Sequence, residues 1–323
     1  MNMESFDRKK GFLSKEFLLS NAVYFVVIAF IITMSIVSDR FLTGKNIINL
    51  LTQSTVLMAL SIGMALTMLT QGIDMSMGSL LFLCAAIMQY CGKKLDWGAA
   101  AMCAAGLGAG VLVGALNGVI AAKLQVYPLL TTLASMYACR GVGLCITGGG
   151  TGLMPMSWGR LTSHKLLGIP VQVYIVVLIA ILFQIFLSCT AFGRHVYAVG
   201  DSEKTAREKG IRITAVKVFA YAASGFMAGV AGIISSSQVV SVPANLGSNQ
   251  ETMAIIAAVL GGTSLFGGRG TTFPCALIGA LIMSCISNSL VLLGAPPNAY
   301  NVVYACVIFF VVLIDTIKSK ILK

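Results

Sequence analysis

The sequence predicts an all-α fold, a polytopic membrane protein with about ten transmembrane helices in a single domain over residues 1–323. Apolar residues make up 57% of the chain and charged residues only 10%. The mean hydropathy is +0.91, which ordinary soluble domains do not approach. Apolar runs recur along the whole length, and the charges gather in short stretches between them.

A helix needs about 20 apolar residues to cross the hydrocarbon core. A basic tail at residues 1–16 precedes the first run, which is too long for a signal peptide and lacks a small-residue cleavage site, so we expect it to be retained. The third and eighth runs are short and lie beside Gly-rich turns, which indicates tilted, broken or re-entrant segments, with eight spans as the alternative count. The expected spans are 17–37, 47–70, 78–91, 98–122, 126–146, 171–189, 216–235, 251–266, 271–293 and 298–317.

The basic residues predict the orientation. With ten spans and the amino terminus inside, fifteen of the 22 Lys and Arg residues fall in cytoplasmic segments, six fall in external loops, and Arg140 lies inside a span. This excess is typical of cytoplasmic loops, so we expect both termini and the polar stretch 190–216 in the cytoplasm. The net charge of +11 does not indicate nucleic-acid binding, because no basic stripe is interleaved with exposed aromatic residues.

Two patterns concern how the helices pack. Glycines recur every four residues in the fourth span, which favours close helix contact, either inside the bundle or at a dimer seam. Segments 47–91 and 251–293 share the order of apolar span, Gly-rich polar turn and apolar run, so we expect two loosely repeated halves, as in many transporters. The packing glycines are Gly106, Gly110, Gly114 and Gly118, and Gly225 and Gly229 repeat the spacing in the seventh span.

Polar side chains within the spans are candidates for a translocation pathway. A carboxylate such as Asp74 costs about 2.5–3.5 kcal/mol at the bilayer centre, so it either forms part of the pathway or caps the next helix. Arg140 needs a counter-ion or backbone carbonyls, and a proton-relay pair with Asp74 is one hypothesis. Uncharged groups suit a neutral polyhydroxylated solute, or equally bind helices together. The candidates are Asp74, Ser76, Asn117, Thr131, Arg140 and Asn288, with Thr132, Gln184 and Ser287 of the same kind.

Several chemistries find no support in the sequence. The stretch GGTSLFGGRG (261–270) lacks the P-loop pattern and is interpreted as a tight turn with Arg269 at the cytoplasmic surface, and GGGTG (148–152) as an external loop. The nine cysteines never form C-x-x-C, so no metal site or disulfide framework is expected. His164 and His195 lie in loops without a hydrolase motif, so no catalytic residue is predicted.

The polar stretch between the sixth and seventh spans reads FGRHVYAVGDSEKTAREKGIRITAVK (192–217). Asp201 and Ser202 are good caps for a short helix over 203–209 that ends at Gly210. Because such a helix is too short to persist alone in water, it suggests an element seated in a partner's groove. A solvated connecting loop is the alternative.

This stretch resembles the cytoplasmic loop of the ribose-type permeases of ABC importers, in the branched-chain amino acid/ribose permease superfamily. Their pattern is roughly FGR-x-x-YA-x-G-x-x-x-x-AA-x-x-x-GI, which Phe192, Gly193, Arg194, Tyr197, Ala198, Gly200, Ala206, Gly210 and Ile211 match. Three further stretches are similar to family motifs in the same order: QGIDMSMGS (71–79), LNGVIAAKLQVYPLLTTLASMYACRG (116–141) and AIIAAVLGGTSLFGGRGT (254–271).

The resemblance implies a permease subunit of an ATP-driven, binding-protein-dependent sugar importer in the bacterial inner membrane. Two copies, or one copy and a paralogue, would form the pathway, and an external binding protein would deliver the sugar. A cytoplasmic ATPase would bind the ATP, so the chain itself is expected to need no cofactor, and would dock on 190–216 to drive alternating access. The implied coupling residues are Gly193, Arg194, Tyr197, Gly200, Asp201, Ala206, Arg207, Gly210 and Ile211.

The chain departs from the family pattern at three places. Met253 stands where the family has Asp, Tyr127-Pro128-Leu129 replaces PPF, and Gly200-Asp201-Ser202 replaces GGN. The first two changes lie near the presumed pathway, so a pentose, hexose, furanoside or sugar-like signalling molecule all remain open, with branched-chain amino acids more distant. An ion-coupled secondary transporter is the alternative from another class, which the shortage of buried carboxylates disfavours, and a channel or scaffold is a third.

Overall fold

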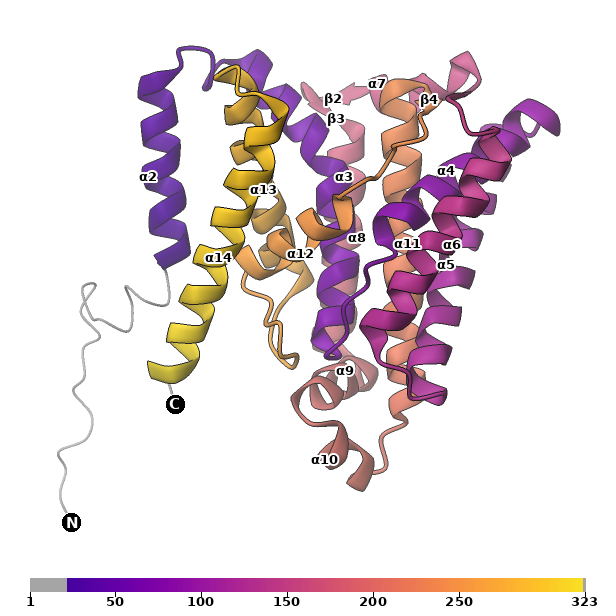
Figure 1. The fold of residues 1–323 in the computed structure, drawn as a ribbon, viewed down its shortest axis with the longest axis vertical. Coiled ribbons are helices and arrows are strands. Elements are labelled where there is room, and N and C mark those ends of the chain that lie inside the picture. Colours follow the sequence, from indigo (N-terminus) through magenta and orange to yellow (C-terminus); the bar gives the residue numbers. More distant parts are fainter. Residues whose placement is uncertain (1–21, 322–323) are drawn as a thin grey trace. The chain divides into compact units, whose positions relative to one another are not determined.

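The computed structural model describes residues 22–321 of the chain, which form helices joined by short loops and two-residue strands (Figure 1). The helices are α2 (Ala22–Val37), α3 (Gly44–Leu69), α4 (Met77–Lys94), α5 (Ala99–Lys123), α6 (Pro128–Thr147), η1 (Met156–Gly159), α7 (Arg160–Ser163), α8 (Val171–Cys189), α9 (Ala191–Asp201), α10 (Glu203–Glu208), α11 (Ile213–Val239), α12 (Gln250–Leu260), η2 (Thr272–Ala276), α13 (Leu277–Leu292) and α14 (Pro297–Ile321). The strands are β1 (Gly152–Leu153), β2 (Lys165–Leu166), β3 (Ile169–Pro170) and β4 (Ser241–Val242).

The chain divides into two compact units. The larger unit is Gly44–Asn288, and the smaller one combines Met1–Thr43 with Ser289–Lys323, of which residues 22–43 and 289–321 are described. All the residues considered in the functional site below lie in the larger unit. The predicted tail 1–16 and the beginning of the predicted first span lie outside the described residues.

Each predicted apolar run contains a helix, but the helices differ in length. Among residues 22–321, six are long and apolar enough to cross a membrane: Gly44–Leu69, Ala99–Lys123, Pro128–Thr147, Val171–Cys189, Ile213–Val239 and Thr272–Leu292. Shorter apolar helical stretches lie at Ile28–Val37, Gln250–Leu260 and Asn298–Phe310. The chain is therefore an all-α polytopic membrane protein, and the count of ten spans stays a prediction.

Helix α11 lies at the centre of the larger unit, where it packs along α5 and α3. The glycine face of α5 allows this closeness: a Cβ built on Gly110 or Gly114 would overlap the backbone carbonyl oxygen of Gly225 or Tyr221 on α11. Small residues let two backbones approach each other in this way. The structure thus places this face against the chain's own bundle.

Two non-helical segments enter the larger unit from opposite ends (Figure 1). Residues 70–76 leave the end of α3 and lead to α4, and residues 243–249 leave β4 and lead to α12. The start of α4 meets the 243–249 segment and the start of α12 inside the unit, because a Cβ on Gly78 would overlap the Gly247 carbonyl oxygen and the Glu251 carboxylate. Helices α4 and α12 therefore both begin in the interior, as the broken or re-entrant segments predicted there would.

The end of the larger unit opposite α9 and α10 is closed by short strands (Figure 1). Strand β1 pairs with β4 and β2 pairs with β3, both antiparallel. Beneath them the buried Trp158 donates its indole N–H to the Ser236 hydroxyl oxygen at 3.0 Å. These bonds hold the β4 end of the 243–249 segment in place.

Replacement of Gly114 by alanine tests the close contact of α5 with α11. We expect Gly114→Ala to lower the free energy of unfolding by about 1–3 kcal/mol, because the methyl group overlaps the Tyr221 carbonyl. The matched control is Gly108→Ala on the same helix, where nothing lies within 4 Å of the new Cβ, and which should stabilise the chain by up to about 1 kcal/mol. Thermal unfolding in detergent measures both, and equal midpoints would contradict the packing described.

Candidate coupling surface and membrane-embedded polar cluster

The polar stretch between α8 and α11 folds into two helices rather than one. Thr190 begins α9, its hydroxyl oxygen accepting a hydrogen bond from the Gly193 N–H at 2.9 Å. Ser202 caps α10 in the same way through the Thr205 N–H at 3.2 Å, and Gly210 follows with a φ of +76°. The predicted short helix is therefore present as α10, whereas α9 was not predicted and the predicted loop 190–216 also includes the start of α11.

The predicted coupling residues divide between two faces of this helix pair. Gly193 and Gly200 lie against other backbone, and Ala206 is buried. Tyr197 is half-buried and donates its hydroxyl to the Gly270 carbonyl oxygen at 3.0 Å. Burial raises the pKa of the Tyr197 phenol, so the hydroxyl remains a donor. The exposed members are Arg194, Asp201, Arg207 and Gly210, and Ile211 is partly exposed.

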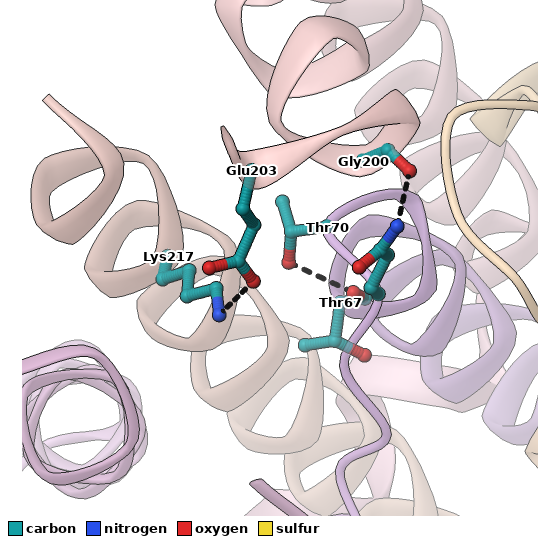
Figure 2. Close-up of polar contacts among 6 residues, drawn as sticks. Thr67, Thr70, Gly200, Glu203 and Lys217 are labelled. Atoms are coloured by element: carbon teal, nitrogen blue, oxygen red, sulfur yellow. Dashed lines mark hydrogen bonds and ion pairs between the residues drawn. The ribbon is translucent and has the colours of Figure 1, made fainter. Parts of the chain in front are cut away.

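The inward face fixes α9 and α10 to the ends of α3 and α11 (Figure 2). The Gln71 side-chain amide donates to the Gly200 carbonyl oxygen at 2.9 Å, and a Cβ on Gly200 would overlap the Leu69 carbonyl. Glu203 of α10 forms an ion pair with Lys217 in α11, whose side chain is only 11% exposed. The helix pair is thus attached to the bundle on one side and presents charges on the other.

A buried carboxylate forms the centre of the polar cluster inside the larger unit. One Asp74 oxygen accepts from the Ser76 hydroxyl at 2.6 Å and the Ser76 N–H at 3.0 Å, and the other accepts from the Ser224 hydroxyl at 2.6 Å. Asn117 donates its amide to the Ser76 hydroxyl oxygen at 3.1 Å. Asp74 and Ser76 of the 71–79 stretch and Asn117 of the 116–141 stretch therefore lie together.

A groove beside this cluster joins two of the predicted pathway residues. It has a volume of about 570 Å³ and lies between α4, α5 and α6, where Asn117 and Thr131 supply polar groups among apolar residues. Thr131 is 6% exposed, and within residues 22–321 its hydroxyl oxygen has no hydrogen-bond partner. The Thr131 hydroxyl is therefore a buried polar group without a partner in the described part of the chain, on a residue that lines the groove.

Arg140 binds the second non-helical segment and not Asp74. Its guanidinium donates to the carbonyl oxygens of Leu246 at 2.7 Å and Ala244 at 3.3 Å. The same group lies over the Phe82 ring of α4, 4.8 Å from its centre. The sequence left two kinds of partner open for Arg140, a counter-ion or backbone carbonyls. The structure shows hydrogen bonds to backbone carbonyls.

Two of the other polar residues join separate elements, and a third bonds within its own helix. Asn288 exchanges two amide hydrogen bonds with Asn46, at 2.9 and 3.0 Å, and Ser287 bonds to the Met283 carbonyl within its own helix. Gln184 accepts from the N–H of Thr272 at 2.9 Å, which joins α8 to η2. Asn288 and Gln184 match the helix-binding alternative stated for them.

Sequence reasoning missed two buried polar residues, Ser224 in the cluster and Glu251 at the start of α12. Ser224 lies within a run of small residues on α11, and Glu251 lies against Gly78 of α4. A Glu just before an apolar run was the signal available for Glu251, since such residues favour the first turn of a helix. Among residues 22–321 no group of His, Cys, Asp and Glu is arranged to hold a metal ion.

A helical membrane bundle with a polar, non-helical interior and a charged helix pair at one end belongs to the class of transport permeases. A family model described as "Branched-chain amino acid transport system / permease component" matches residues 46–312. The chain belongs to this family. It is a permease subunit of the ABC importer class, a transport component rather than an enzyme, and a multi-pass protein of the inner membrane.

Named relatives cover nearly the whole chain. The ribose import permease protein RbsC of Escherichia coli strain K12 is 35% identical over 315 residues, which are 96% of this chain and 98% of the relative. RbsC of Bacillus subtilis is 38% identical over 297 residues, 90% of each chain. The autoinducer 2 import system permease protein LsrC of Salmonella typhi is 33% identical over 293 residues, 90% of this chain and 83% of the relative. No solved structure matches the chain.

Removal of the Arg140 guanidinium tests its role in holding the second segment. Arg140→Met keeps an apolar side chain beside Phe82 but leaves the Leu246 and Ala244 carbonyls unpaired, so we expect a loss of about 1–3 kcal/mol of stability. Hydrogen exchange should become faster at residues 244–249. The exposed Arg160, replaced in the same way, should have no effect. Rescue of Arg140→Met by Asp74→Asn would instead indicate that the two charges act as a pair.

Proposed function

We propose that this chain is the membrane subunit through which a sugar or sugar-like molecule enters the cell, driven by a separate ATPase. The observation that carries the proposal is the helix pair α9–α10, whose inward face is bonded to the bundle while its outward face is charged. Relatives named as importers of ribose and of autoinducer 2 support a small polyhydroxylated solute.

The outward face of α9–α10 is the proposed docking surface for the ATPase. It mixes charges of both signs, which favours a specific, oriented contact over general attraction. Helix α10 has six residues and relies on contacts outside itself for stability, and a partner's groove would add to those it makes with the bundle. The exposed charged residues are Arg194, Asp201, Lys204, Arg207, Glu208 and Lys209.

The proposed translocation pathway passes the groove that Asn117 and Thr131 line. Amide and hydroxyl groups donate and accept hydrogen bonds without carrying charge, which suits sugar hydroxyls. Apart from Ser135, the other residues that line the groove are apolar. A second permease copy or a paralogue would complete it. An external binding protein would deliver the sugar, and ATP would be bound by the ATPase and not by this chain.

The proposed topology has ten spans in two loosely repeated halves, with α9–α10 and both termini in the cytoplasm. The basic residues of α9 and α10 support this orientation, because cytoplasmic segments carry the excess of Lys and Arg. The predicted repeat pairs 47–91, which holds α3 and α4, with 251–293, which holds α12, η2 and α13.

The ATPase contact can be tested by charge reversal. We expect Arg207→Glu to weaken co-purification of the ATPase by about tenfold, roughly 1.4 kcal/mol, because an exposed docking charge is reversed. Lys93→Glu, which makes the same change in net charge at an exposed site on α4, is the control. The chain alone should neither bind ATP nor move ribose in proteoliposomes. Uptake by the chain alone along an ion gradient would refute the proposal in favour of a secondary transporter.

The orientation can be tested with two cysteine variants. In a background where the exposed Cys145, Cys189 and Cys306 are serine, Leu167→Cys should react with a membrane-impermeant maleimide in intact cells. Lys204→Cys should react only after permeabilisation, because α10 lies at the opposite end of the larger unit (Figure 1). The reverse labelling pattern would place the docking surface outside the cell.

A further inference from the structure

We propose that the loop 261–271 and Gln71 form a two-armed joint that passes movement of α9 to both non-helical segments inside the bundle. This inference rests on the proposed function, because it takes α9–α10 as the place where the ATPase acts. It gives the glycine-rich stretch GGTSLFGGRG a role beyond that of a turn.

The first arm connects α9 to the segment that contains Asp74. Gln71 donates its side-chain amide to the Gly200 carbonyl oxygen at 2.9 Å, and Gly200 lies directly against the Leu69 carbonyl. Gln71 itself has a φ of +59°, so the chain turns sharply at this residue and enters the 70–76 segment. A shift of Gly200 therefore acts at the start of that segment.

The second arm connects α9 to α12 through the glycine-rich loop. Tyr197 donates to the Gly270 carbonyl at 3.0 Å, and the Gly268 N–H donates to the Leu69 carbonyl at 3.2 Å. Gly267 and Gly268 have φ values of +84° and +69°, and a Cβ on Gly267 would lie 2.6 Å from the Gly200 carbonyl oxygen. Glycine is needed at both positions because the backbone is left-handed and tightly enclosed.

Both arms lead to the point where α4 and α12 meet. The first continues through 72–76 into α4, and the loop of the second follows directly after α12. The amino-terminal turns of α4 and α12 meet at Gly78, which lies against Gly247 and Glu251. A displacement of α9 would thus reach both α4 and α12 at the point where their amino-terminal turns meet.

Two substitutions remove the bonds of the joint with little change in volume. Tyr197→Phe removes the hydroxyl that binds Gly270, and Gln71→Met removes the amide that binds Gly200. Tyr174→Phe is the matched control, because the Tyr174 hydroxyl makes the same kind of bond, at 3.1 Å to the Leu166 carbonyl, near the opposite end of the bundle.

The experiment measures hydrogen exchange in the complex of the full chain with its co-purifying ATPase, before and after trapping with ATP and vanadate. In the wild type we expect trapping to change exchange at both 72–76 and 244–249. Gln71→Met should reduce this response mainly at 72–76, and Tyr197→Phe mainly at 244–249, each by about fivefold, the size expected for one lost hydrogen bond. Tyr174→Phe should respond like the wild type.

The double variant Gln71→Met/Tyr197→Phe tests whether the two arms together transmit movement of α9. If it binds the ATPase normally and both segments still respond as in the wild type, the joint does not transmit movement and the inference is overturned. Loss of ATPase binding in the double variant would also overturn it, since these residues would then only position the docking surface. Failure of the wild-type chain to hold any ATPase would instead refute the proposed function.

Discussion

Every backbone polar group inside the hydrocarbon region must find a partner within the protein, and this constraint governs the larger unit. Two stretches, 70–76 and 243–249, break the helical pattern there and leave carbonyls that no helix satisfies. Thr132 donates to the Ile73 carbonyl at 3.2 Å, and Arg140 donates to those of Leu246 and Ala244. The irregular backbone persists because side chains from α6 complete its hydrogen bonds.

The same constraint explains why helices lie so close together around Gly78, where the amino-terminal turns of α4 and α12 meet. Irregular backbone is tolerated at this depth only when protein surrounds it, and α4 accordingly buries every residue from Met77 to Ala86. The glycine face of α5 brings that helix against α11, and Ser224 of α11 then reaches the Asp74 carboxylate. The close contact of α5 with α11 therefore goes together with the assembly of the polar cluster around Asp74.

The positions of the apolar helices were predictable from sequence because the length of an apolar run is a local property. Helix α9 was missed because it has only 11 residues and includes Gly193 and Gly200, which disfavour a helix. Its helical form depends on contacts with Leu69 and Gly270 that lie far away in the chain. The pathway candidates could be named by residue type, but their partners could not. Asp74 and Ser224 are 150 positions apart, and Asn46 and Asn288 are 242 apart. No local pattern distinguishes a residue facing a groove from one that joins two helices.

The bonding of Asp74 also bears on the kind of transport. A carboxylate offers about four acceptor positions, and the two serines already occupy three of them. An ion-coupled transporter needs a carboxylate that exchanges its partner for a cation during each cycle. Asp74 is instead held by neutral donors from α11 and from its own segment, where it fixes the irregular backbone beside the groove. A structural carboxylate next to uncharged donors suits the passage of a neutral solute. The energy for that passage would then come from a separate ATPase and not from an ion gradient.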